Sequence, residues 1–356
     1  MVMPHRPVTP GRSSQPGAAR RLARALMVTA AATTALAMTA AVGQAAPVAP
    51  KPDKKDVKAQ VDQLYTEAEQ ENEKANAAEE AQRRLQADAG ALQQQVADAQ
   101  DTLNRMRGDL ATLAGAEYRS GGMDPTVQLI LSSDPEAYLN RARTLDQAAQ
   151  QRAAKLRDVR DQQRRLDQKR AEATGKLAEL DGVRQTLLQS KQRTQQRLQK
   201  AQALLDSLDA TERAQLAEDD ADEARAGRGA DRVDLASLPP ASDRAAVAVA
   251  AALSKVGSPY VYGSTGPGAF DCSGLMYWSW RQAGVTLPRT SQAQAFGGRR
   301  ISLSEARPGD LVIFFKDMHH VGMYVGGGTV VHAPHPGARV RYESVAVMPV
   351  AAVVRP

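Results

Sequence analysis

The chain has a single cysteine, Cys272, among its 356 residues, and only 4% of its residues are aromatic. One cysteine cannot form an internal disulfide bond, and it cannot build a cysteine-rich zinc site. Cys272 is therefore a free thiol. It is either a small buried core residue or a reactive group.

Acidic residues are absent from the first 25 residues, which contain five arginines, and an apolar stretch over about 26–42 follows. This pattern predicts a secretory signal over 1–45 and a short linker over 46–56. The apolar stretch is shorter than the ~20 strongly apolar residues that a membrane span needs. Removing residues 1–45 leaves 41 basic and 40 acidic residues, so the net charge falls from +6 to +1. The basic composition is thus no argument for nucleic-acid binding.

Residues 57–210 nearly lack aromatic residues and proline, and are rich in Ala, Gln, Arg, Leu, Asp and Glu. Apolar residues recur there in steps of three and four, the a/d pattern of a coiled coil, over 92–113 and again over 145–208. Polar residues such as Arg152 and Gln163 interrupt the second seam. The equal length of the two arms favours an antiparallel hairpin in a monomer over a parallel homodimer.

Glycine and proline interrupt the helical pattern at about 119–135, the predicted tip of the hairpin. Little core exists at the end of a two-helix rod, so apolar residues there either form a docking surface for a partner or pack against the hairpin's own end. The residues concerned are Val127, Leu129, Ile130 and Leu131. Residues 211–240 are acidic and then rich in Gly, Ala, Arg and Pro, which predicts a flexible linker.

Cys272 lies in the run FDCSGL at 270–275, just before a predicted helix over 275–283 that ends near Gly284. A cysteine in the first turn of a helix feels the positive end of the helix dipole, which favours the thiolate. The thiolate is the nucleophilic form, so this position suits a catalytic cysteine.

Three strands are predicted downstream, over 310–315, 319–325 and 329–333. In a hairpin centred on Gly326, His320 and His332 would lie directly opposite each other on one face, with Cβ atoms ~4.5–5.5 Å apart. One imidazole could then take the thiol proton while the other holds its ring. His319 shares its face with an apolar row, so His320 is the expected base.

Six segments, in order, resemble the NlpC/P60 cysteine peptidases of bacterial cell walls. They are 257–260, 271–274, 287–291, 307–311, 320–326 and 332–333. The resemblance covers about residues 241–356, and it implies a papain-like α+β domain. The expected fold is therefore multidomain: a long α-helical coiled-coil hairpin followed by an α+β papain-like NlpC/P60 domain.

The resemblance also implies roles for individual residues. Cys272 resembles the nucleophile, His320 the general base and His332 the third, orienting residue. Four further residues resemble those that contact the oxyanion, the amine or the carboxylates of the substrate: Tyr260, Asp271, Ser273 and Arg289. No metal or other cofactor is implied, because one cysteine and two sheet histidines do not make a convincing zinc site.

The expected function is that of a secreted peptidoglycan endopeptidase at the cell wall, acting on stem peptides between D-γ-glutamyl and a diamino acid. Chains with a coiled coil before an NlpC/P60 domain resemble division-associated hydrolases, whose coiled coils contact a membrane-embedded ABC-transporter-like complex. One alternative is a coiled-coil adaptor protein with little hydrolase activity of its own. Another is an acyltransferase or amidase on the same scaffold. A free wall hydrolase would endanger its own cell, so a fold-back of the hairpin that occludes Cys272 is also expected.

Overall fold

The computed structural model describes residues 53–119, 127, 134–229 and 239–356. The expected signal over 1–45 and the tip residues Leu129, Ile130 and Leu131 lie outside the described residues, and Val127 is 45% exposed. Among the described residues, no helix combines the length and the apolar character needed to cross a membrane.

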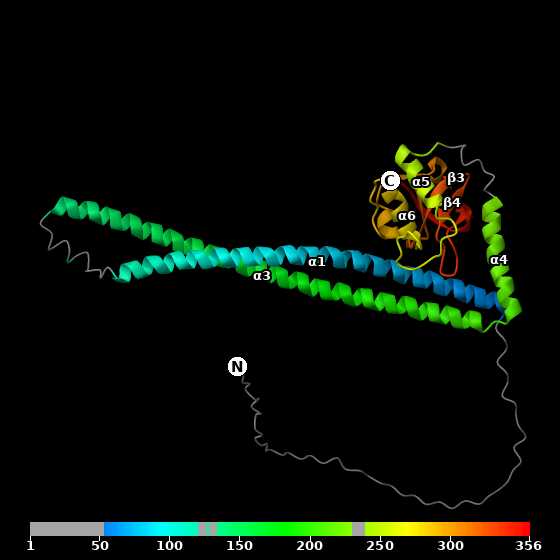
Figure 1. Ribbon diagram of the computed structural model, residues 1–356, viewed down its shortest axis with the longest axis horizontal. Coiled ribbons are helices and arrows are strands. Elements are labelled where there is room, and N and C mark those ends of the chain that lie inside the picture. Colours follow the sequence, from blue (N-terminus) through cyan, green and yellow to red (C-terminus); the bar gives the residue numbers. More distant parts are fainter. Residues whose placement is uncertain (1–52, 120–126, 128–133, 230–238) are drawn as a thin grey trace, which may run out of the picture. The chain divides into compact units, whose positions relative to one another are not determined.

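Two long helices, α1 (Lys54–Arg119) and α3 (Pro135–Asp206), pack side by side in Figure 1. Their contacts run in opposite sequence directions. Glu67 near the start of α1 bonds Arg197 near the end of α3, whereas Arg107 bonds Gln163. The helices are therefore antiparallel within one chain, as the predicted hairpin requires.

Local signals at the start of α3 explain where the second arm begins. Asp134 is its N-cap and accepts hydrogen bonds from the backbone N–H groups of Glu136 and Ala137. Pro135 fills the first helical position, where a backbone N–H would have no partner in any case. This start lies at the end of the tip range expected from the sequence.

The hairpin buries a thin apolar seam. One cluster joins Ala99 and Leu103 of α1 to Leu166 of α3, and another lies where the open ends of the hairpin meet α4. Part of the predicted second seam is not buried, because Leu145, Leu156 and Leu177 are 43–50% exposed. A helix pair has one narrow shared face, so these leucines find no apolar partner there.

The predicted flexible linker over 211–240 is wrong in its first part. Residues Ala210–Gly229 form helix α4. Asp209 and Glu212 cap its first turn reciprocally, and Lys54 and Lys58 of α1 pair with Asp219 and Asp220. The acidic run that suggested disorder is thus a helix with cationic partners supplied from more than 150 positions earlier in the chain, which local composition does not show.

The C-terminal part is an α+β domain, as predicted. A six-stranded antiparallel sheet has the order β1-β6-β2-β3-β4-β5. Its strands are β1 (Arg299–Ile301), β2 (Leu311–Phe314), β3 (His320–Gly326), β4 (Thr329–His332), β5 (Arg341–Ser344) and β6 (Val350–Arg355). Helices α5 (Asp243–Leu253), α6 (Cys272–Gln282) and α7 (Ser291–Gln294) precede it, and 3-10 turns lie at Leu303–Glu305 and Val345–Val347.

The main core of this domain lies between the helices and the sheet. It includes Ala248 of α5, Leu275 and Trp280 of α6, and Val321 and Met323 of β3. A second cluster covers the opposite face of the sheet around Phe314 and Tyr324. Packing of α6 against β3 brings the first residue of α6, Cys272, to the beginning of β3, where His320 lies.

The hairpin seam gives a first prediction. Leu103 is fully buried, whereas Leu188 on α3 is 68% exposed. Leu103→Ala should lower the free energy of unfolding of the hairpin by about 2–5 kcal/mol, because a buried leucine leaves a cavity. Leu188→Ala should change it by less than about 0.5 kcal/mol. Urea unfolding followed by far-ultraviolet circular dichroism measures both, and equal effects would mean that the seam is not where the hairpin is held.

Candidate functional site

Cys272 begins α6 behind a well-formed cap. Asp271 is the N-cap residue and accepts a hydrogen bond of 2.7 Å from the backbone N–H of Gly274. The tight turn requires glycine at position 274, since a Cβ there would lie 2.1 Å from the carbonyl oxygen of Ser264. The thiol of Cys272 is completely buried.

A chain of polar side chains runs away from the thiol across the sheet. His320 Nε2 lies 2.8 Å from His332 Nδ1, and the two rings meet edge to face. His332 Nε2 lies 2.7 Å from a carboxylate oxygen of Glu343 on β5. The Nε2 atom of each ring therefore has a polar partner on the side away from Cys272. The Nδ1 atom of His320 lies on the side of the thiol.

The predicted direct opposition of His320 and His332 is wrong. The register pairs Met323 with Val331, and it shifts between Tyr324 and Gly326. This offset places His332 beside Gly322, where a Cβ would lie only 3.2 Å from the Cβ of His332. The missing side chain at Gly322 lets the His332 ring lean across to His320, so the two rings still meet on a diagonal.

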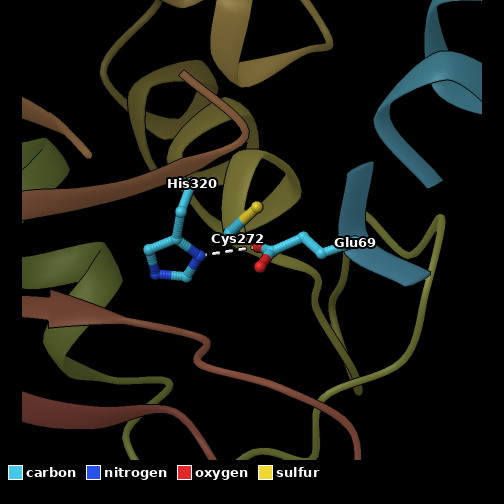
Figure 2. Close-up of side chains that lie close together, drawn as sticks. All are labelled: Glu69, Cys272 and His320. Carbon is cyan, nitrogen blue, oxygen red and sulfur yellow. Dashed lines mark hydrogen bonds and ion pairs between the residues drawn. The ribbon is translucent and has the colours of Figure 1, made fainter. Parts of the chain in front are cut away.

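Helix α1 covers this site. Glu69 places a carboxylate oxygen 2.6 Å from His320 Nδ1, the contact drawn as a dashed line in Figure 2. Cys272 lies beside the same carboxylate in that view. One donor atom from each of Glu69, Cys272 and His320 lies within 4.8 Å of the other two, close enough to share a metal ion.

One turn further along α1, Glu73 enters the site. Its carboxylate accepts hydrogen bonds from Ser273 Oγ at 2.7 Å and from the backbone N–H of Ser291 at 2.7 Å. The thiol of Cys272 lies 4.0 Å from the same carboxylate. The hairpin therefore reaches the cysteine through two carboxylates on one face of α1.

Asn72 and Asn76 hold the same helix to the domain. Their side-chain amides donate to Asp271 Oδ2 at 3.2 and 3.3 Å. Outside the buried region, Gln70 donates to Asp317, and the Tyr65 ring stacks on His335 at 5.2 Å. Polar side chains at 69, 70, 72, 73 and 76 thus provide the side-chain hydrogen bonds from α1 to the domain.

The structure brings the expected substrate residues together as a network. Arg289 donates from its two terminal nitrogens to the carboxylate of Asp271 at 2.6 and 3.1 Å, and to Ser273 Oγ at 2.8 Å. Tyr260 is 5% exposed, and burial, with the nearby charge of Glu69, raises the pKa of its hydroxyl well above the usual value. All four expected residues therefore lie around Cys272, and Asp271 also serves as the helix cap.

His319 lies outside this chain of rings. Its Nδ1 lies 2.6 Å from Asp317, and its ring stacks on Phe315 at 4.4 Å. Only its backbone carbonyl approaches the site, 3.8 Å from Cys272 Sγ. The geometry thus agrees with the preference for His320 over His319.

The expectation of a thiolate at Cys272 is wrong for this closed arrangement. Burial raises the pKa of the thiol well above its usual value, and the charges of Glu69 and Glu73 raise it further. Burial and these two charges together outweigh the dipole of α6, whose effect on a charge is typically below ~1 kcal/mol. With α1 in place the thiol stays protonated and hidden.

Burial and nearby charges also shift the pKa values of the neighbouring groups. Burial would lower the pKa of His320, but the adjacent Glu69 raises it above its usual value. Burial lowers the pKa of His332 to about 4, even though Glu343 acts in the opposite direction. Burial, with the charge of Asp271, raises the pKa of Glu73 to about 7. The site therefore concentrates acidic groups around a neutral thiol.

Sequence reasoning missed Glu69, Asn72, Glu73 and Asn76, together with Glu343. The four α1 residues stand at helix positions i, i+3, i+4 and i+7, so they form one polar stripe ahead of the heptad pattern that the sequence shows from Leu92. This change from a polar to an apolar stripe is the signal that could have been read. It does not reveal the surface that the stripe contacts.

Helix α6 begins at a cysteine and packs on β3 of an antiparallel sheet, and β3 begins at a histidine. This is the arrangement of a papain-like α+β domain. Residues 257–352 match the sequence profile described as the NlpC/P60 family. The C-terminal part of this chain is therefore an NlpC/P60 domain.

Relatives match within this region. A protein of Mycobacterium tuberculosis named "Probable endopeptidase" is 50% identical over 99 residues, 28% of this chain and 26% of that protein. One of Corynebacterium glutamicum with the same description is 45% identical over 120 residues, 34% of this chain and 57% of that protein. The chain thus spans between a quarter and three fifths of the length of these relatives. The NlpC/P60 domain of the peptidoglycan hydrolase SagA is 35% identical over 32% of this chain and 98% of its own, with a TM-score of 0.30.

The covered thiol gives a second prediction. Cys272 is the chain's one cysteine, so alkylation by iodoacetamide reports this thiol alone. Glu73→Ala removes charge-assisted hydrogen bonds worth ~1.5–3 kcal/mol, and should speed alkylation of residues 46–356 roughly 10–100-fold. Glu80→Ala, at a half-exposed position on the same helix, should leave the rate unchanged. Fast alkylation of the unaltered chain would show that α1 does not cover the site in solution.

Proposed function

We propose that this chain is a secreted peptidoglycan endopeptidase that cuts stem-peptide amide bonds by nucleophilic catalysis from Cys272. The observation that carries the proposal is the line of side chains from Cys272 through His320 and His332 to Glu343. The family of residues 257–352 and the endopeptidase names of the relatives support it. Secretion rests on the arginine-rich, then apolar, first 45 residues of the sequence.

In the proposed reaction His320 Nδ1 takes the proton of the Cys272 thiol, and the sulfur attacks the amide carbonyl carbon. The tetrahedral intermediate collapses when the same imidazole returns the proton to the leaving amine. Water, deprotonated by His320, then attacks the thioester and releases the carboxylate product and the free thiol. His332, backed by Glu343, holds the His320 ring and stabilises its charged form.

The proposed bond lies between a D-γ-glutamyl residue and a diamino acid. Such a substrate carries free carboxylates and amines, which need charged partners. The buried Asp271–Arg289 pair, with Ser273 and Ser291 beside it, offers both signs of charge next to the thiol. Tyr260 has a buried hydroxyl with no hydrogen-bond partner among the described residues, so it is available to an oxyanion or to the substrate.

In this proposal α1 is a reversible inhibitor of the same chain. Glu69 and Glu73 occupy the space that a substrate needs beside Cys272. The interface is polar, which is typical of contacts that form and break. A cavity of about 660 Å³ also lies where α1, α3 and α4 meet the loop at 335–341. An activating partner, such as the ABC-transporter-like complex expected at the hairpin tip, would lift α1 from the site.

Replacing the proposed catalytic groups gives a third prediction. In residues 241–356, checked for folding by circular dichroism, Cys272→Ala should abolish release of muropeptide fragments, because no other thiol is present. His320→Ala should be nearly as damaging, and His332→Ala less so, because an orienting residue contributes less than a base. His319→Ala should keep most of the activity, since its side chain bonds Asp317 instead.

Mass spectrometry of digested peptidoglycan measures these rates and identifies the bond that is cut. Near-normal activity of Cys272→Ala would overturn the mechanism, and an inactive His319→Ala with an active His320→Ala would reverse the roles of the two histidines. If neither the unaltered domain nor any variant digested peptidoglycan, the result would favour the adaptor role.

The inhibitory helix gives a fourth prediction. At equal concentration, residues 241–356 should digest peptidoglycan faster than the mature chain, because they lack Glu69 and Glu73. The mature chain carrying Glu69→Ala and Glu73→Ala should gain activity too, by roughly 10-fold or more if two charge-assisted contacts are lost. Glu80→Ala is the matched control. Equal rates for all forms would leave the hairpin with a targeting role only.

A further inference from the structure

Three elements from distant parts of the chain each contribute one metal-binding side chain to the same buried point. Glu69 comes from α1, Cys272 from the start of α6 and His320 from the start of β3. Their donor atoms lie within 4.8 Å of one another, and all three residues are buried. Figure 2 shows the carboxylate, the sulfur and the imidazole converging.

The donors are those that zinc prefers. Zn²⁺ binds thiolate sulfur at ~2.3 Å and imidazole nitrogen or carboxylate oxygen at ~2.0–2.2 Å, and three protein ligands with one open position form a common site. Tetrahedral ligands at those lengths stand roughly 3.3–3.8 Å apart. The present 2.6 Å between Glu69 and His320 would open slightly and the sulfur would close in, within reach of side-chain rotations.

The surroundings of His320 favour a metal at Nδ1. Histidine ligands almost always have their second ring nitrogen held by a hydrogen-bond partner, which fixes the ring and its tautomer. His320 Nε2 has such a partner in His332 at 2.8 Å, and His332 is held in turn by Glu343 at 2.7 Å. The nitrogen that faces the thiol and Glu69 is the one that this arrangement leaves to a ligand.

The charge of the buried cluster points the same way. Asp271 is matched by its ion pair with Arg289. Glu69 and Glu73 bring two more carboxylates to the thiol from α1, and Glu73 is bonded by the neutral groups of Ser273 and Ser291. Buried charges are stable when they are paired or coordinate a metal, so a divalent cation would suit this acidic pocket.

We propose that Glu69, Cys272 and His320 form a zinc-binding site that exists when α1 lies on the NlpC/P60 domain. The sequence alone did not suggest zinc, because the third ligand comes from a helix 203 positions before the cysteine. On binding, the thiol of Cys272 and the hydrogen bond between His320 Nδ1 and Glu69 each give up a proton to solvent, and the sulfur, the ring nitrogen and the carboxylate oxygen then bind the metal.

The consequence for activity rests on the proposed function, whereas the binding itself does not. Because one ligand belongs to α1 and two to the domain, zinc binds the closed form and stabilises it by RT ln(1 + [Zn²⁺]/Kd). The metal also occupies the sulfur and the imidazole nitrogen that the reaction requires. Zinc would therefore stabilise the resting enzyme in its closed form, and zinc would have to leave before α1 could leave the domain.

Cobalt substitution tests the site without an activity assay. Titration of the mature chain with CoCl₂ should give a thiolate-to-cobalt charge-transfer band that saturates at one equivalent, and ZnCl₂ should displace it. Cys272→Ala should abolish the band. Glu69→Gln should weaken zinc affinity, measured by chelator competition, by at least the 10–100-fold that loss of an outer-shell partner costs. Glu80→Gln should leave the affinity unchanged.

A second measurement guards against misfolded variants. In the unaltered chain, stoichiometric ZnCl₂ should slow alkylation of Cys272 further, and a chelator should restore the rate. Absence of a cobalt band in the unaltered chain would overturn the proposal. So would equal zinc affinity of the unaltered chain and folded Glu69→Gln, since it would mean that the cysteine and histidine bind metal without α1. Either result can occur whether or not the chain digests peptidoglycan, so failure of the zinc site and failure of the proposed function are distinguishable.

Discussion

The contact between the Glu69 carboxylate and His320 Nδ1 is the constraint around which this structure is arranged. It joins the hairpin to the ring that lies between the thiol and His332. A carboxylate placed there is desolvated, and burying it is costly unless it is paired. Glu69 is stabilised by His320, and His320 is held in turn by the line of partners that ends at Glu343. The register of β3 and β4, the missing side chain at Gly322 and the position of α1 therefore support one another.

Under the proposed function, the polar contacts between α1 and the domain would let this long helix cover Cys272 reversibly. An apolar interface of this extent would resemble a domain core and would not open readily. Here the side-chain hydrogen bonds from α1 to the domain come from Glu, Gln and Asn residues, which water can satisfy once α1 leaves, and they lie beside the stacked rings of Tyr65 and His335. The apolar residues of the hairpin are used instead between α1 and α3, around Leu103 and Leu166, and at its base. Departure of α1 from the domain would therefore leave the packing between α1 and α3 intact.

Heptad periodicity predicted the paired arms, and the six family-like segments predicted the α+β domain. Cys272, His320 and His332, expected from the sequence to act together, lie close together in the structure. The rest depended on contacts between distant segments. The polar stripe of α1 is visible in the sequence, but nothing local assigns it to a cysteine 203 positions later. The acidic segment after Asp209 looked disordered because its cationic partners, Lys54 and Lys58, belong to α1. The opposition of the two histidines failed because a shift near Gly326 changes the register by an amount that turn residues alone do not specify. Burial by α1 also reversed the expected direction of the thiol pKa.

Under the proposed function, the departure of α1 from the domain and the binding of the stem peptide are coupled. Glu73 is held by Ser273 and Ser291, beside the Asp271–Arg289 pair that the proposed function assigns to charged groups of the stem peptide. A peptide carboxylate and the Glu73 carboxylate compete for the same donors, so α1 and substrate exclude each other by charge as well as by volume. Departure of α1 would lessen the burial of Cys272, the largest cause of its raised pKa, and would remove the charges of Glu69 and Glu73 that raise that pKa further. Under the proposed function, exposure of Cys272 and a fall in the pKa of its thiol would follow from a single movement of α1, and the closed chain would be inactive both sterically and chemically.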